Sequence, residues 1–201
     1  MAAATPGGGI DRRATRESPA PAGAGALALT LFLMALAMFF AASVVGFLLI
    51  RARQPEWPPA GSPPLPGGLW LATLVLVAGS AAAQAALGAI RRGSQRGLRT
   101  GLVATLALTV LFLGVQAANW SALAREGLTP GRNLFGFAFY ILTGMHAAHV
   151  VGGLVVLVLV AAKALRGGYS AGYHPGVRSV TVYTHFLTVV WIVMFGVVFL
   201  T

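Results

Sequence analysis

The sequence predicts an all-α integral membrane protein with five transmembrane helices. Apolar residues make up 57% of its 201 residues and charged residues only 9%, whereas about a quarter of a typical soluble domain is charged. The apolar residues gather in five blocks that contain no Asp, Glu, Lys or Arg. Each block reaches the roughly 20 residues that a helix needs to cross a hydrocarbon core about 30 Å thick. Backbone groups in lipid must be bonded internally, and no block alternates like a barrel strand, so each is expected to be a helix.

The first block is preceded by a segment of different composition. Residues 1–26 are rich in Ala, Gly and Pro and contain three Arg, which predicts a disordered tail. The first block, 27–50, is longer than the apolar core of about 7–15 residues in a signal peptide, so we expect a retained span. The following segment, 51–68, holds six Pro and is expected to be extended.

The four remaining blocks follow in order and complete a membrane domain that covers residues 27–201. A basic turn at 91–100 separates the second block from the third, and polar segments separate the later ones. The predicted spans are therefore 27–50, 69–90, 101–120, 134–160 and 179–200.

The charge distribution predicts the orientation. With five spans, the tail and the second and fourth connections share one side, and they hold ten of the 14 Lys and Arg residues. The positive-inside rule then places the N-terminus in the cytoplasm and the C-terminus in the periplasm. The net charge of +10 is thus a topology signal. We expect no nucleic-acid partner, because the chain has too few charges to cover a soluble basic surface. The absence of Cys excludes a disulfide scaffold, a cysteine-ligated metal and a cysteine nucleophile.

Three histidines inside the spans are the sharpest chemical signal: His146, His149 and His185. Their imidazoles could ligate a haem, take part in a proton relay or bond to a neighbouring helix. No span contains Asp or Glu, which weakens the relay, and no third ligand supports a metal site at His146 and His149. Gly144 and Gly152 belong to a small-residue stripe, which predicts close approach of another helix and disturbed packing or subunit association if either becomes Leu.

Two spans resemble a known family. The segment Phe139–Val150, followed by Gly152-Gly153-Leu154, is similar to the signature span of subunit III of the haem–copper respiratory oxidases. The segment Tyr183–Phe195 is similar to the last span of that family, and weaker matches lie earlier, for example at Trp57-Pro58-Pro59. Five spans match the short bacterial form of the subunit.

The resemblance implies an accessory, non-redox subunit of a bacterial terminal oxidase in the inner membrane. It implies packing on catalytic subunit I, which holds haem and copper, contacts with other oxidase subunits, and bound phospholipid. It also implies support of assembly and sustained turnover in aerobic electron transport. The chain itself is then expected to hold no catalytic centre, no metal and no cofactor other than lipid. The structural or lipid-cleft candidates are His146, His149, His185, Tyr183, Trp191, Gly144 and Gly152.

The chain departs from the family at its acidic intramembrane positions. Neutral residues occupy the four places in question: Leu36, Asn119, Thr184 and Thr188. Thr184 replaces the usual tryptophan before the histidine, and the other three replace a glutamate, an acidic residue and an aspartate. The departures put direct proton conduction in doubt and leave two alternatives open. One is an accessory subunit of a nitric oxide reductase, and the other is a b-type cytochrome with His149 and His185 as ligands.

Overall fold

The computed structural model describes residues 24–200, so most of the predicted tail lies outside the described residues. Five helices make up the chain: α1 (Ala24–Ala52), α2 (Gly68–Arg91), α3 (Gln95–Arg125), α4 (Leu134–Leu165) and α5 (Pro175–Leu200). All five are long and apolar enough to cross a membrane. The predicted all-α fold with five transmembrane helices is confirmed.

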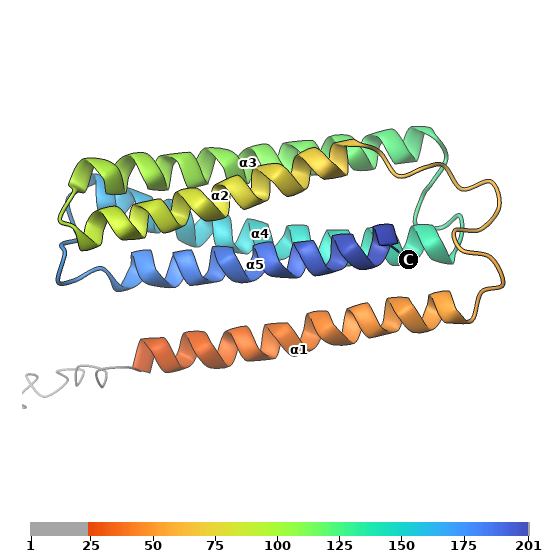
Figure 1. Cartoon of the computed structure of the whole chain (residues 1–201), viewed down its shortest axis with the longest axis horizontal. Coiled ribbons are helices and arrows are strands. Elements are labelled where there is room, and N and C mark those ends of the chain that lie inside the picture. Colours follow the sequence, from red (N-terminus) through yellow and green to blue (C-terminus); the bar gives the residue numbers. More distant parts are fainter. Residues whose placement is uncertain (1–23, 201) are drawn as a thin grey trace, which may run out of the picture.

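The helices form an up-and-down bundle with one outlying member (Figure 1). Helices α2, α3, α4 and α5 close a four-helix ring in which each helix contacts its two neighbours. Helix α1 contacts only α4 and α5 and runs along one side of the ring. The bundle therefore has a tightly packed part and a loosely attached first helix.

Helices α3 and α4 extend beyond their predicted spans, α3 at both ends and α4 at its C-terminal end, whereas α4 begins at the predicted residue 134. The Ser94 side chain accepts a hydrogen bond from the Gly97 amide at the start of α3, and Asn133 does the same for Gly136 at α4, as N-cap residues do. At the other end, α4 is followed by Gly167, whose φ of 76° is a left-handed conformation that glycine adopts without a steric penalty.

The closest helix contact lies between α2 and α3. A Cβ atom added to Gly101 would lie 2.7 Å from the Cβ atom of Ala86 and 2.9 Å from its Cα atom. Small residues on both helices thus bring the two backbones together, as is common between membrane helices.

Helix α1 and the proline-rich connection that follows it are fastened by aromatic contacts. Leu36, Phe40 and Phe47 of α1 are buried against α4 and α5. The Trp57 ring lies edge-on between the rings of Phe47 and Phe135, with centroids 5.4 and 5.3 Å away. The connection is therefore folded back onto the bundle rather than standing free.

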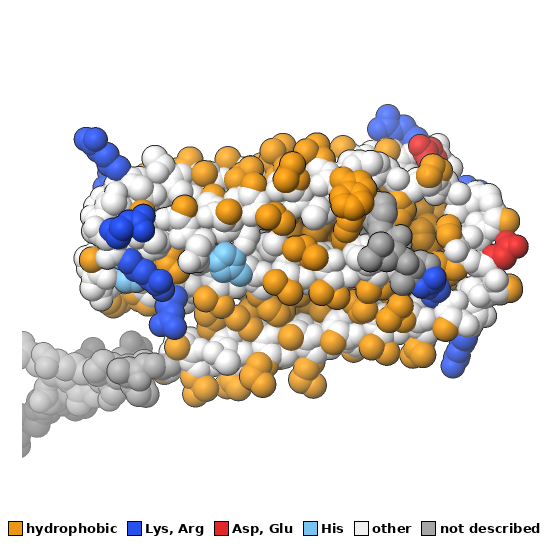
Figure 2. All heavy atoms as spheres, in the orientation of Figure 1, with side chains coloured by type: hydrophobic (Ala, Val, Ile, Leu, Met, Phe, Trp, Pro, Cys, Tyr) orange, Lys and Arg blue, Asp and Glu red, His pale blue; other side chains and the backbone are white. Residues whose placement is uncertain are grey.

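The charged side chains of the described residues lie at the two ends of the bundle, and on the face that Figure 2 shows the side chains between these ends are mainly hydrophobic. The end where α1 begins has no acidic residue between residues 24 and 200. The basic residues at this end, called here the basic end, are Arg91, Arg92, Arg96, Arg99, Lys163, Arg166 and Arg178. The other end mixes two Glu with the Arg residues. The helix order thus separates the charges as the sequence predicts.

Candidate functional site

The three intramembrane histidines occupy three different environments. His146 is fully buried at the centre of the bundle. Its Nε2–H donates to the Leu187 carbonyl of α5 at 3.0 Å, and its ring centroid lies 5.0 Å from that of Trp191. The Nδ1 atom has no hydrogen-bond partner among the described residues. His146 therefore joins α4 to α5 from within the core.

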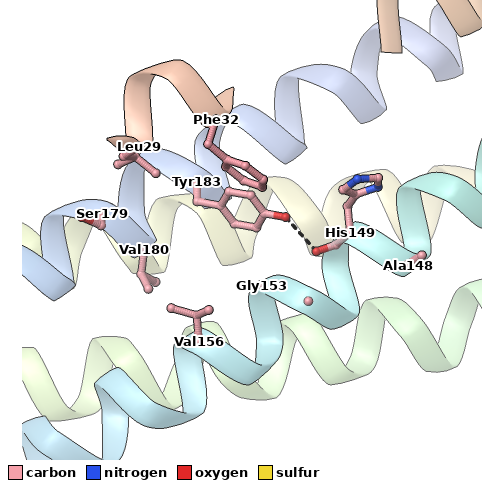
Figure 3. Close-up of a pocket in the computed structure, with 10 residues that line it drawn as sticks. Leu29, Phe32, Ala148, His149, Gly153, Val156, Ser179, Val180 and Tyr183 are labelled. Atoms are coloured by element: carbon pink, nitrogen blue, oxygen red, sulfur yellow. Dashed lines mark hydrogen bonds between the residues drawn. The ribbon is translucent and has the colours of Figure 1, made fainter. Parts of the chain in front are cut away.

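His149 faces the outlying helix instead. Its ring lies 5.1 Å from the Phe40 ring of α1, and its Nδ1–H donates to the Met145 carbonyl of its own helix at 2.7 Å. The Tyr183 hydroxyl of α5 donates to the His149 backbone carbonyl at 3.0 Å (Figure 3). One turn of α4 thus contacts α1 through its side chain and α5 through its backbone.

His185 points toward α2. Its Nε2–H donates to Gln84 Oε1 at 3.1 Å, so its Nδ1 atom is the acceptor that bonds the Ser80 hydroxyl. Both ring nitrogens are therefore engaged with α2, while His149 lies against α1. The two histidines lie at similar depth, because Tyr183, two residues before His185, bonds to the His149 carbonyl. The His149 ring contacts α1, however, whereas the His185 ring contacts α2. This arrangement lends no support to a cytochrome that uses His149 and His185 as ligands.

Trp191 lies at the junction of three helices. Its Nε1–H donates to the Thr73 hydroxyl of α2 at 2.9 Å, and its ring meets Phe112 of α3 edge-on with centroids 5.1 Å apart. A second tryptophan, Trp120, bonds Thr143 across α3 and α4 at 3.1 Å. Both indoles thus combine buried ring area with a cross-helix hydrogen bond.

The four neutral positions are all placed among packed residues. Leu36 is 6% exposed and lies in the apolar cluster between α1, α4 and α5. Thr184 and Thr188 donate back to Val180 and Thr184 carbonyls, both at 2.9 Å. Asn119 is 5% exposed, and its Nδ2 group has no partner among the described residues. The replacements therefore leave no acidic group inside these spans.

A series of hollows follows the seam between α1 and α5, and we call it the α1 groove. Its three parts have volumes of about 430, 360 and 380 Å³. The first part lies at the basic end and includes the exposed Arg178. The middle part is lined by Phe32, His149 and Tyr183 and is almost wholly apolar (Figure 3).

The predicted small-residue stripe makes no close contact with another helix within residues 24–200. A Cβ atom at Gly144 or Gly152 would have no atom of another described helix within 4 Å, and Gly152 opens into the α1 groove. The neighbouring Gly153 is the packed glycine, because a Cβ there would lie 2.5 Å from Cε1 of Tyr183. The four-residue spacing of the stripe that contains Gly144 and Gly152 therefore marks a face of α4 that is open, whereas the face that packs against α5 carries Gly153.

We therefore expect opposite results from two adjacent substitutions. Gly153→Leu must displace the Tyr183 ring, which breaks its bond to His149 and its stacking on Phe32. Overpacking of this kind costs about 1–3 kcal/mol. Gly152→Leu is the matched control and should leave the free energy of unfolding nearly unchanged. Thermal unfolding of the full chain in detergent measures both, and equal loss of stability would contradict the assignment.

Several contributing residues were not among the sequence candidates. Thr73, Phe112 and Ser80 each meet a candidate histidine or tryptophan. Ser80 and Gln84 stand four residues apart on one face of α2, which is the signal that could have paired them with a histidine. No comparable signal marks Thr73 or Phe112, whose residue types are common in membrane helices.

The loop between α4 and α5 completes the basic end. The Lys163 ammonium lies 5.1 Å from the ring centroid of Tyr169. Burial raises the pKa of the Tyr169 phenol above its usual value, and the nearby Tyr173 raises it further. The phenol therefore stays neutral at physiological pH, and the cationic side chains dominate the charge of this end.

Comparison with known proteins agrees with this architecture. The family model described as cytochrome c oxidase subunit III matches residues 24–201. A cytochrome c oxidase subunit 3 of Synechocystis sp. is 36% identical over 171 residues, which cover 83% of this chain and 71% of the relative. A cytochrome c oxidase subunit 3 of Thermostichus vulcanus is 31% identical over 165 residues, which cover 82% of this chain and 81% of the relative. The chain belongs to the cytochrome c oxidase subunit III family, a family of accessory oxidase subunits, and is a multi-pass membrane protein.

Proposed function

We propose that this chain packs on catalytic subunit I of a bacterial haem–copper terminal oxidase and supports its assembly and sustained turnover. Family membership supports this role. The observation that carries it is the use of His146 and Trp191 as helix-to-helix contacts, which join α4 to α5 and α5 to α2. His146 and Trp191, which lie in the two spans that resemble the family, thus hold the helices of this chain together. Nitric oxide reductase is not favoured by any observation on this chain.

A scaffold role fits the chemistry of the membrane interior better than proton conduction does. A proton path through a membrane usually uses carboxylates as well as histidines, and all four acidic residues of this chain lie outside the helices' apolar blocks. Threonine hydroxyls at positions 184 and 188 are bonded within their own helix. Any buried acid needed by the oxidase would then come from a partner chain.

The orientation we propose places the basic end in the cytoplasm. Seven basic residues and no acidic residue lie at that end within residues 24–200, and cytoplasmic segments are enriched in Lys and Arg. The site of the complex would be the bacterial inner membrane, with the C-terminus of α5 on the periplasmic side.

We also propose that the α1 groove holds a phospholipid. Its middle part is apolar enough for an acyl chain, and Arg178 at the basic end offers a cation to the phosphate. An Arg near an anionic lipid surface contributes about 1 kcal/mol. Helix α1, which contacts only α4 and α5, would then be fastened to the bundle partly through lipid.

Arg178→Ala should lower the phospholipid retained by the purified protein about fivefold, the equivalent of about 1 kcal/mol. Arg96→Ala is the matched control, since it removes the same charge from the same end but does not line the groove. Native mass spectrometry of the complex in mild detergent measures bound lipid. Equal retention in both variants would show that the groove binds no phosphate through Arg178.

Deletion of the chain tests the supporting role. We expect the remaining oxidase to start at a comparable turnover number and to lose activity sooner during continuous turnover. Unchanged activity over the same time course, with the catalytic subunit assembled normally, would contradict a supporting role.

A further inference from the structure

The outer surface at the seam of α2 and α5 carries polar groups at the depth of the hydrocarbon. Gln84 is exposed on α2, seven residues before Arg91, which corresponds to about 10 Å along the helix. His185 beside it is half-buried. The surrounding side chains are apolar, and Figure 2 shows a histidine among them on this face.

The hydrogen bonds of this cluster leave one kind of group unpaired. Gln84 Oε1 accepts from His185 Nε2–H, and Ser80 donates to His185 Nδ1. The Nε2 group of Gln84 has two N–H donors, and no residue between 24 and 200 accepts from it in the structure. The exposed Gln84 amide therefore presents two unpaired N–H donors to whatever lies outside.

An unpaired N–H donor at this depth costs free energy when it faces lipid chains, because the chains offer no hydrogen-bond acceptor. The residues around Gln84 on the outer face of α2 are small, since Ala78, Ala81 and Ala85 are all exposed. Small residues allow the backbone of another helix to come close, near enough for its side chain to accept from Gln84. An ordinary lipid-facing surface would have large apolar side chains here, as α4 has at Leu159.

We propose that this face of α2 and α5 is a docking surface for a transmembrane helix of another oxidase subunit, and that this helix places a hydrogen-bond acceptor opposite Gln84. The acceptor is a carboxylate or an amide oxygen. This inference rests on the proposed function in one respect: the partner is taken to be a subunit of the oxidase. The Gln84 donors would then be paired with a group that residues 24–200 do not supply.

Site-specific photocrosslinking in the native membrane complex tests the surface. A benzophenone side chain is placed at Ala81 or Ala85, and at Leu159 on α4 as the control position. We expect adducts from both α2 positions to one transmembrane segment of another oxidase subunit, with an acceptor residue at matching depth. Adducts to lipid alone would overturn the inference, while co-purification with a haem-containing catalytic subunit would leave the proposed function standing. Adducts to a protein outside any oxidase, without such co-purification, would overturn the proposed function.

Gln84→Met supplies the second measurement, because methionine keeps the length of the side chain and removes both donors. We expect the chain to dissociate from the purified complex about threefold to tenfold more readily in detergent, the range for a membrane hydrogen bond. Ser43→Ala is the control, since that hydroxyl bonds only to Phe39 of its own helix. Retention equal to that of the control, with unfolding temperatures unchanged, would overturn the assignment of Gln84.

Discussion

Gly101→Leu should strongly destabilise the bundle. A Cβ at this position would lie 2.7 Å from the Ala86 Cβ and 2.9 Å from its Cα atom. Because one of these atoms belongs to the backbone, α2 and α3 would have to move apart along their closest contact. We expect a loss of about 3 kcal/mol in the free energy of unfolding, or about 6–12 °C in the unfolding temperature.

Gly114→Leu on the same helix is the matched control, because a Cβ there would have no atom of another described helix within 4 Å. Both changes raise helix propensity by a similar amount, so the difference between them reports packing alone. Thermal unfolding of the full chain in detergent measures both variants. Similar unfolding temperatures for the two would mean that α2 and α3 are not in the close contact described here.

Trp191→Ala is expected to have the second large effect. The indole is 2% exposed and fills the space between α2, α3 and α4, where it contacts Thr73, Phe112 and His146. Truncation of a buried tryptophan costs about 3–5 kcal/mol through lost contacts and the cavity left behind. The same unfolding measurement, together with the amount of subunit recovered in the complex, checks this expectation.

Trp191→Phe separates the ring from its hydrogen bond. The phenylalanine keeps most of the buried ring and loses only the bond to Thr73, whose hydroxyl still donates to the Leu69 carbonyl. We expect a loss of about 1 kcal/mol. Leu159→Ala on the exposed face of α4 should have almost no effect on the isolated chain. A Trp191→Ala variant as stable as Leu159→Ala would contradict the central position of the indole.

The number and type of the helices could be predicted from the sequence because the membrane imposes length and composition on every span. Several ends could not be predicted, since α3 begins at the Ser94 cap in the basic turn rather than at residue 101, and α3 and α4 continue past residues 120 and 160. Charge separation was also predictable, because helix order alone decides which connections share a side.

The contacts of the candidate site were less predictable. Gly152 and Gly153 differ by about 100° around α4, and nothing in one sequence tells which of them faces a neighbouring helix. Likewise, the polar faces around Gln84 and His185 were visible separately, but their pairing depends on how α2 and α5 rotate against each other. Leu36, Asn119 and Thr188 had the clearest signal, since the absence of an acidic residue that the resemblance leads one to expect is visible in the sequence itself.

Purification of the native membrane complex tests the central claim most directly. The chain is tagged at its N-terminus, extracted in mild detergent, and its partners are identified by mass spectrometry alongside an absorbance spectrum. A haem–copper catalytic subunit present in equal amount, with haem bands that disappear when that subunit is removed, is the predicted result. A complex without such a subunit, or a haem that stays with the isolated chain, would contradict the account.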